Sequence, residues 1–358
     1  MPITAAVEGS APSMQAVVFT DYGRTPQLTR VAVPDCPEDG VLVRVGATGV
    51  CRSDWHAWRG HDPVALPHVP GHEMAGVVAE VGPAVTGWRV GDRVTAPFVC
   101  GCGRCEFCTT GNAQVCPDQT QPGFTGPGSF AELVAVHAAD TNLVRLPDSV
   151  DLLTAASLGC RFATAFRALT GHAPVSPGDW VAVHGCGGVG LSAVMIGAAL
   201  GARVVAVDVA EPALRRAREL GAEAVVDAGR DDPVTAVRDV TGGGAHLSLD
   251  ALGAPATAVS SVRCLRPRGA HVQVGLLLGA HATPPLPMDL LVANELSVHG
   301  SHGMAARDYP AMMDLVASGA LRPDLLVGEV IALEDAGAAL AAMDQPARAG
   351  GMTVVRIG

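Results

Sequence analysis

A glycine-rich turn lies near the middle of the chain, between a β-prone run and a helix-prone run. The turn follows WVAVH and opens LSAVMIGAAL, and its residues are Gly185, Cys186, Gly187, Gly188, Val189 and Gly190. In this GxGxxG pattern the first glycine makes the turn, the second lets backbone approach a pyrophosphate, and the third permits tight packing of helix on strand. In this context the turn predicts a dinucleotide site, and a turn without a ligand is the less favoured interpretation.

An acidic residue follows at the spacing that ribose recognition requires. Asp208 ends the next β-prone run, ARVVAVDV, 23 positions after Gly185. Its carboxylate would accept hydrogen bonds from the adenosine ribose hydroxyls, and its charge would repel a 2′-phosphate. We therefore expect NAD rather than NADP.

Strand-like and helix-like runs alternate from about Trp180 to about residue 302, which predicts a doubly wound parallel sheet of six strands. The first 150 or so residues instead carry short β-prone runs broken by Gly or Pro, among them VLVRVGATGV and AGVVAEV, typical of an all-β unit with irregular loops. From Gly303 the sequence predicts a helix followed by a strand. The 358 residues are enough for two domains, so we expect a two-domain α/β protein.

Charge and composition exclude several functions. The net charge of −11 argues against nucleic acid as a partner. All 24 basic residues are Arg, so P-loop enzymes, Schiff-base enzymes and hydride-transfer families that need a Tyr–Lys pair are excluded.

Two segments bear on membranes and targeting. The start, MPITAAVEGSAPS, lacks the basic and apolar segments of a secretory signal, which favours the cytoplasm. The uncharged run Val181–Ala202 is long enough for a membrane span, but its glycines and its strand-like start favour a buried strand, turn and helix. We expect no membrane partner.

Five of the ten cysteines fall between positions 100 and 116. Four of them have the spacing of a closed tetrahedral zinc site that would order the loop: Cys102, Cys105, Cys108 and Cys116. Free buried cysteines fit poorly, because the intervening residues are mostly polar or small. Cys100 could replace Cys102 as a ligand, although the repeated spacing of two favours Cys102.

Two further segments carry residue types that bind metals. They are CRSDWH, residues 51–56, and GHE, residues 71–73. A lone His72 is more often a core or surface histidine than a ligand, so the case depends on the combination.

These motifs together resemble the medium-chain zinc-dependent alcohol dehydrogenases, in particular their bacterial and yeast branch. The run GHEMAGVVAEVGPAV fits the family signature, and CRSDWH, the four-cysteine loop, LGCRFATAF and the glycine-rich turn follow in the family's order over nearly the whole chain. The resemblance implies a GroES-like catalytic domain, residues 1–161 and 303–358, and an NAD-binding Rossmann domain, residues 162–302. It also implies hydride transfer between a primary or secondary alcohol and NAD.

The resemblance further implies two zinc ions. Cys51, His72 and Cys160 would hold a catalytic zinc whose fourth position is left to water or to the substrate oxygen, which lowers the hydroxyl pKa. The sequence alone does not single out Cys160 from Cys186 or Cys264. A cysteine as third ligand favours alcohol dehydrogenases over polyol dehydrogenases, which use a carboxylate there.

Other roles follow from the same resemblance. Asp54 would accept the free ring N–H of His72, and Glu73 would approach the metal from behind. Ser53 and His56 would relay the released proton, with a helix cap and a surface histidine as the alternative interpretations.

The cofactor and the substrate also have expected contacts. Arg52 would pair with the cofactor pyrophosphate, and Thr164 would pack behind the nicotinamide. Phe98, Trp55 and Trp58 would form walls of the substrate pocket, although aromatic residues are more often plain core.

The loop between Cys116 and Phe130 is short, as in the bacterial and yeast members of the family that the chain resembles, and this resemblance implies a homotetramer, with a dimer as the alternative. No role is assigned to the residues before Met14. Three alternatives remain: a relative acting on polyols, amino alcohols or acyl-CoA, a non-catalytic NAD-binding protein, and a zinc-free quinone or enoyl reductase. Both ligand sets argue against the last, and the intact catalytic residues argue against the second.

Overall fold

The computed structural model describes residues 12–345 and 351–358. The chain divides into two compact units. Unit 1 comprises Met1–Ala163, Gly303–Gly319 and Pro323–Gly358, and unit 2 comprises Thr164–His302 and Ala320–Arg322. Residues 1–11, which carry the expectations about a signal and an N-terminal extension, lie outside the described residues.

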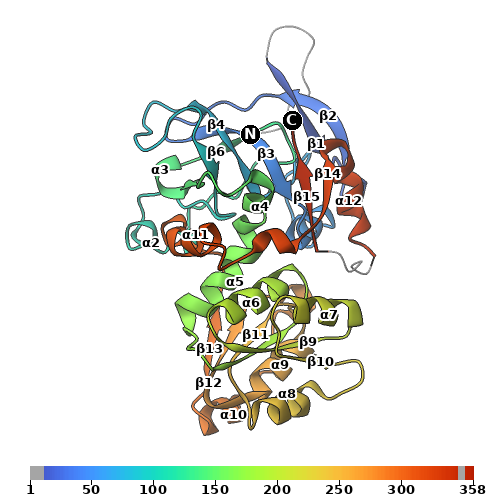
Figure 1. Ribbon diagram of the computed structural model, residues 1–358. Coiled ribbons are helices and arrows are strands. Elements are labelled where there is room, and N and C mark those ends of the chain that lie inside the picture. The colour runs from blue at the N-terminus through green and yellow to red at the C-terminus, as the bar shows by residue number, and fades with distance from the viewer. Residues whose placement is uncertain (1–11, 346–350) are drawn as a thin grey trace. The chain divides into compact units, whose positions relative to one another are not determined.

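Unit 1 is built around a seven-stranded sheet of order β14-β15-β3-β4-β5-β7, with β6 paired to β3, and a separate antiparallel pair β1-β2 (Figure 1). Its strands are β1 (Ser13–Val18), β2 (Gln27–Ala32), β3 (Val41–Gly49), β4 (Met74–Val81), β5 (Arg93–Thr95), β6 (Leu133–Val136), β7 (Val144–Arg145), β14 (Val327–Ala332) and β15 (Met352–Arg356). Its helices and short helical turns are α1 (Arg52–Trp58), α2 (Glu106–Thr109), η1 (Ala113–Val115), α3 (Ala139–Asn142), α4 (Leu152–Ala156), η2 (Leu158–Phe162), η5 (Ala306–Asp308), α11 (Tyr309–Ala317), η6 (Pro323–Leu326), η7 (Leu333–Asp335) and α12 (Ala336–Ala342).

The strands of unit 1 carry β-branched residues at alternate positions, and these side chains point into one hydrophobic core. In β3, Val41, Val43 and Val45 are buried together with many other apolar side chains of the unit. Strand β3 shifts register against β4 at two points. At Gly76 the two strands approach so closely that a Cβ atom would lie 2.1 Å from the Arg44 carbonyl oxygen, so this position requires glycine.

Two local features position the candidate site. Helix α1 begins after Cys51, whose backbone N–H donates to Asp54 Oδ2 at 3.1 Å. The segment Leu158–Phe162 forms a π-helical turn directly after α4, and Asp151 caps α4 by accepting from the Thr154 N–H. Such turns are rare and frequent at functional sites, and the sequence analysis did not anticipate this one.

Unit 2 has one parallel sheet of order β10-β9-β8-β11-β12-β13, which is the 3-2-1-4-5-6 order of a Rossmann fold. The expected six-stranded doubly wound sheet is therefore confirmed. Its strands are β8 (Trp180–His184), β9 (Arg203–Asp208), β10 (Ala224–Asp227), β11 (Ala245–Asp250), β12 (Leu265–Gln273) and β13 (Ser297–Gly300). Its helices are α5 (Ala163–Arg167, at the boundary of the units), η3 (Ala168–His172), α6 (Gly188–Ala199), α7 (Glu211–Glu219), α8 (Pro233–Thr241), α9 (Pro255–Arg263), η4 (Gly279–His281) and α10 (Met288–Ala293).

The uncharged run Val181–Ala202 forms the fully buried strand β8, the turn and helix α6, as expected. Across residues 12–345 and 351–358, none of the helices combines the length and the hydrophobicity that crossing a bilayer requires.

The segment after Gly303 differs from the expectation of one helix and one strand. It forms α11, β14, α12 and β15 in that order, with short helical turns between them. Strand β14 lies at the edge of its sheet and is largely exposed, so its sequence VGEVIA lacks the alternation of apolar and polar residues that predicts a strand.

Candidate functional site

Three segments far apart in the sequence bring their metal-binding side chains together in unit 1. Cys51 precedes α1, His72 lies just before β4, and Cys160 lies in the π-helical turn. One ligand atom of each residue lies within 4.8 Å of the others. His72 Nε2 is buried and has no hydrogen-bond partner among the described residues. A buried nitrogen without a partner is costly, and two sulfur atoms and an imidazole are a known catalytic zinc set, so these residues fit the metal.

Asp54 orients the imidazole of His72. Its fully buried carboxylate accepts from His72 Nδ1 at 2.8 Å and from the Gly71 N–H at 3.0 Å, besides the Cys51 N–H. Although burial opposes protonation, the Asp54 charge raises the pKa of His72 in the metal-free protein. The same bond holds the proton on Nδ1 and leaves the Nε2 lone pair available for a metal.

A hydrogen bond couples the two thiols of this cluster. A hydrogen bond from Cys160 lowers the pKa of Cys51 well below its ordinary value, with help from the positive charge of Arg161. The same bond raises the pKa of Cys160. The hydrogen bond therefore makes Cys51 the more acidic of the two thiols, and thiolates are the form that binds zinc.

Glu73 lies in a buried ion pair with Arg161. Arg161 Nε donates to Glu73 Oε1 at 3.0 Å, Arg161 Nη2 bonds to Oε2, and the Arg161 N–H adds a bond of 3.2 Å to Oε1. Gly49 leaves the necessary room, since a Cβ there would lie 2.3 Å from Glu73 Oε2. The sequence analysis did not identify Arg161, although an arginine inside the apolar run SLGCRFATAF needs a buried acidic partner.

Ser53 and His56 lie on one face of α1, because they are three residues apart. Ser53 Oγ is 3.9 Å from Cys51 Sγ. The half-buried His56 places its Nδ1 3.3 Å from Nδ1 of His61, a residue that the sequence analysis did not single out.

Two aromatic rings pack edge-on against His72. Phe98 lies 6.1 Å and Phe124 lies 5.2 Å from it between ring centroids. Phe124 was not predicted, although a lone aromatic residue in the glycine-rich loop PGFTGPG is unusual enough to mark it.

Trp55 and Trp58, which were expected to line the substrate pocket, have different contacts from Phe98 and Phe124. Trp55 Nε1 donates to Asp344 Oδ1 at 2.8 Å. Trp58 is buried in the hydrophobic core and donates to the Arg24 carbonyl, as expected of a core residue.

The residues expected near the cofactor fall in both units. Arg52 is exposed, stacks 4.7 Å from the centroid of Trp55 and donates to the Met343 carbonyl at 2.7 Å. Thr164 lies buried in α5.

The four-cysteine loop, residues 102–116, collects the sulfur atoms of Cys102, Cys105, Cys108 and Cys116 within 4.8 Å of one another. Backbone N–H groups of Arg104 and Cys105 lower the pKa of Cys102 to about 6. Cys100 is outside this group, since it is buried, donates to the Pro97 carbonyl and has a pKa raised to about 12 by burial. The spacing argument for Cys102 over Cys100 therefore agrees with the geometry.

The glycine-rich turn of unit 2 has the conformation that its sequence requires. Gly185 has a φ of +91°, and a Cβ at Gly190 would lie 1.7 Å from the Gly185 carbonyl oxygen. At Gly187 a Cβ would meet no atom within 4 Å, so the backbone there is open to a ligand. Helix α6 begins with Gly188 and Val189, and a helix N-terminus favours anions.

Asp208 ends β9 and is tied to this turn. Its Oδ2 accepts from the Cys186 N–H at 2.6 Å and its Oδ1 from the Ala210 N–H at 2.8 Å. The carboxylate is therefore oriented by the turn before any ribose binds.

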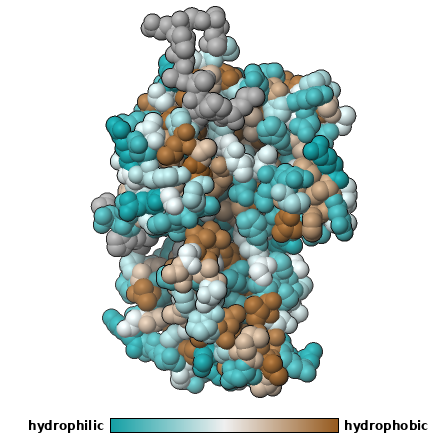
Figure 2. Space-filling model, turned by 180° about the vertical axis from the view of Figure 1, so that it is seen from behind, coloured by the Kyte–Doolittle hydropathy of each residue, from teal (hydrophilic) through white to brown (hydrophobic). Residues whose placement is uncertain are grey.

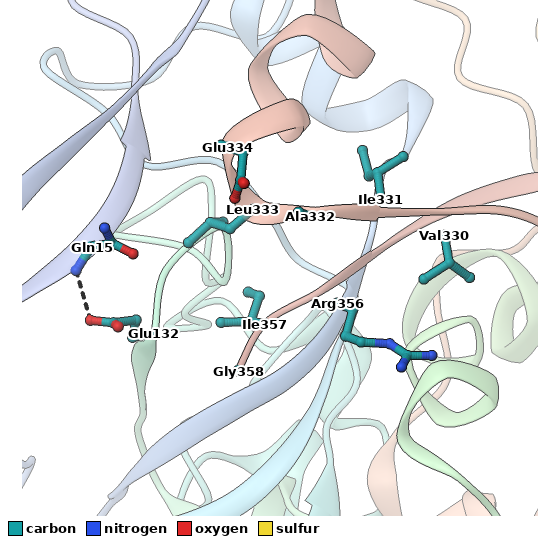
Figure 3. A pocket seen from close by; sticks show the side chains of 10 residues that line it. All are labelled: Gln15, Glu132, Val330, Ile331, Ala332, Leu333, Glu334, Arg356, Ile357 and Gly358. Carbon is teal, nitrogen blue, oxygen red and sulfur yellow. Dashed lines mark hydrogen bonds between the residues drawn. The ribbon is translucent and has the colours of Figure 1, made fainter.

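Unit 1 also has a surface pocket that is separate from the candidate zinc sites (Figure 3). Its walls come mainly from β14, η7 and β15, and Gln15 donates its backbone N–H to Glu132 at one side. None of the candidate metal or relay residues lines it.

Comparison with known proteins agrees with this site. Residues 37–148 match the alcohol dehydrogenase GroES-like domain, and residues 188–318 match the zinc-binding dehydrogenase family. An alcohol dehydrogenase of Geobacillus stearothermophilus is 34% identical over 88% of this chain and 92% of its own length.

Solved structures agree over almost the whole chain. Alcohol dehydrogenase TADH from Thermus sp. ATN1 has a TM-score of 0.87 and 31% identity, covering 96% of this chain and 100% of that one. A structure described as an NAD-dependent alcohol dehydrogenase has a TM-score of 0.86 and 30% identity, with the same coverage. Together with the two thiol clusters and the glycine-rich turn, these matches identify the chain as a member of the zinc-binding dehydrogenase family with an alcohol dehydrogenase GroES-like domain.

Proposed function

We propose that the protein is a zinc-dependent alcohol dehydrogenase that transfers hydride between a primary or secondary alcohol and NAD. The observation that carries this proposal is the unpartnered, buried Nε2 of His72 beside the thiols of Cys51 and Cys160. In the proposed division of labour, residues 1–161 and 303–358 form the catalytic domain and residues 162–302 the NAD-binding domain.

The chain's own residues have distinct roles at the catalytic centre. Zinc, when bound by Cys51, His72 and Cys160, supplies a Lewis acid that makes the alcohol oxygen more acidic. Asp54 holds the imidazole of His72 in the tautomer that can bind the metal. The buried Arg161, held by Glu73, places a positive charge close to Cys51 and helps to lower the pKa of that thiol, whereas the Glu73 charge raises the pKa of Cys160.

Proton release and substrate binding involve neighbouring side chains. Ser53 lies against Cys51 and would pass the alcohol proton toward His56. Phe98 and Phe124, which pack against His72, would exclude water from the reacting carbon, and the half-buried Trp55 of α1 would form a further wall.

The glycine-rich turn of unit 2 would bind the cofactor pyrophosphate. The open backbone at Gly187 and the start of α6 suit a pyrophosphate, Arg52 would add a positive charge, and Thr164 would pack behind the nicotinamide. Cys102, Cys105, Cys108 and Cys116 would hold a second, structural zinc with no open position.

The test of the activity is NADH formation at alkaline pH with primary, secondary, aromatic and terpenoid alcohols, with NADP in parallel and bound zinc measured on the same sample. Turnover of one alcohol group with two zinc ions per chain supports the proposal. Zinc well below one per chain, with no turnover, would reject it in favour of a zinc-free reductase. Turnover of polyols, amino alcohols or acyl-CoA substrates alone would place the chain with other relatives.

Cofactor choice gives a separate prediction. Asp208→Gly removes the carboxylate that faces the ribose position, so we expect the ratio of kcat/KM for NAD over NADP to fall by about 10-fold or more. Asp227→Gly is the matched control, because Asp227 ends the neighbouring strand β10 in register with Asp208. An unchanged ratio in Asp208→Gly would show that this residue does not select the cofactor.

We further propose a homo-oligomer, a tetramer or otherwise a dimer, in the cytoplasm. The edge strand β13 and helix α10 expose apolar side chains, with Met288 62% and Val292 78% exposed, and apolar surface is visible over unit 2 in Figure 2. An unpaired strand edge beside exposed apolar residues suits a second copy of the chain. None of the ten cysteines, all of which lie among the described residues, is paired in a disulfide, which suits a reducing compartment. Light scattering of the purified protein measures the oligomeric state directly.

A further inference from the structure

His61 lies at the outer end of the helix that carries the proposed relay. The chain turns back after α1, and the backbone N–H groups of His61 and Asp62 both donate to the His56 carbonyl, at 2.9 and 3.3 Å. This turn places Nδ1 of His61 3.3 Å from Nδ1 of His56. His56 is half-buried and His61 is exposed, so the pair leads outward from the interior.

The two imidazoles are held by a third ring. Trp55 makes edge contacts with both, at centroid distances of 5.0 Å to His56 and 5.2 Å to His61. Trp55 is itself fixed by its hydrogen bond to Asp344 and by the Arg52 guanidinium over its face. The histidine pair is therefore supported on several sides.

We propose that His61 is the second member of the proton relay, carrying protons between His56 and bulk water. This inference rests on the proposed dehydrogenase function. Two nitrogen atoms at this distance can share one hydrogen only if one ring donates and the other accepts, which neutral imidazoles do.

The proton balance is simple. During alcohol oxidation a proton reaches Nε2 of neutral His56 by way of Ser53, and the Nδ1 proton of His56 passes to Nδ1 of His61. His61 then releases its Nε2 proton to water, and exchange with solvent restores the starting tautomers. The reverse order supplies a proton for carbonyl reduction.

The surroundings of His56 favour its neutral ring. Burial, followed by the positive charges of His61 and Arg52, lowers the pKa of His56, while Cys51 and Asp62 act in the opposite direction. The carboxylate of Asp344, in the C-terminal segment, lies nearby, because it accepts the hydrogen bond from Trp55 Nε1.

The test compares His61→Asn with the wild-type holoenzyme. Asparagine can still hydrogen-bond to His56 Nδ1 but cannot carry a proton. We expect kcat for alcohol oxidation near neutral pH to fall about 10-fold in dilute buffer and to recover when imidazole is added, with zinc content unchanged. The control His137→Asn replaces an exposed histidine elsewhere in unit 1 and should show neither effect.

A second measurement does not need turnover. Nitrogen-15 NMR of the zinc-loaded protein should show one hydrogen shared between the Nδ1 atoms of His56 and His61, and the His56 titration should change in His61→Asn. Wild-type kinetics in His61→Asn at low buffer, or independent titration of the two rings, would overturn the proposal. If no alcohol is turned over at all, the dehydrogenase function fails instead, and the NMR result alone decides whether the rings are coupled.

Discussion

The four-cysteine loop and the cluster of Cys51, His72 and Cys160 are both candidate zinc sites, but they differ in where their ligands lie in the sequence. The loop takes all its thiols from residues 102–116, and most of them are partly exposed. The other cluster takes its ligands from three distant segments, and Asp54, Glu73 and Arg161 are buried around it. A closed zinc site can be built from four ligands that are close together in the sequence. A site with one open coordination position has only three protein ligands, so it depends on the surrounding buried residues to orient those ligands and to shield them from solvent.

The largest expected effect separates the two clusters by substitution. Cys160→Ala should remove one zinc and lower kcat by roughly 1000-fold or more, because the metal loses a ligand while the loop stays intact. Cys105→Ala should instead lower the thermal midpoint and leave kcat of the folded fraction within several-fold of wild type. Zinc content, thermal unfolding and turnover measured on both variants check this. Retained activity in Cys160→Ala would reject the ligand assignment.

A second prediction concerns the buried ion pair beside the open site. Glu73→Gln leaves Arg161 buried without a charge partner, so we expect the free energy of unfolding to fall by about 3–5 kcal/mol in urea denaturation. The control is Glu223→Gln, which breaks the exposed pair with Arg203 in unit 2 and should cost about 0–1 kcal/mol. An equal fall in the free energy of unfolding in the two variants would show that the buried ion pair stabilises the protein no more than the exposed one.

The smallest of these effects tests ligand orientation. Asp54→Asn keeps the size of the side chain but weakens its hold on His72 Nδ1, so zinc affinity at the open site should fall by about 10–100-fold. The zinc of the four-cysteine loop should be unaffected, since none of its ligands contacts Asp54. Titration with a competing chelator distinguishes the two ions, and Asp148→Asn, on the surface of unit 1, serves as the control. Equal weakening of both ions would contradict the prediction.

Local patterns predicted much of the fold and part of the site. The six parallel strands of unit 2 were predictable because buried strands and helices differ in length and in apolar periodicity. The exposed edge strand β14 and the π-helical turn were not, since neither produces such a pattern. The sequence analysis missed Arg161 and Phe124 because they contact Glu73 and His72, which are distant in sequence. It missed His61 because the turn that brings this residue to His56 is not predictable from the sequence.

The sequence by itself determined the features that depend on short-range spacing: the glycines that only a tight turn and close packing require, the four thiols of one loop, and the absence of lysine chemistry. Residue identity and spacing are sufficient there, because the participating residues lie within a few positions of one another in the chain. Only the tertiary structure decided which thiols flank His72, that Glu73 pairs with Arg161 and that His56 meets His61. Those contacts depend on how the packing of the core brings separate segments together, and no local pattern records it.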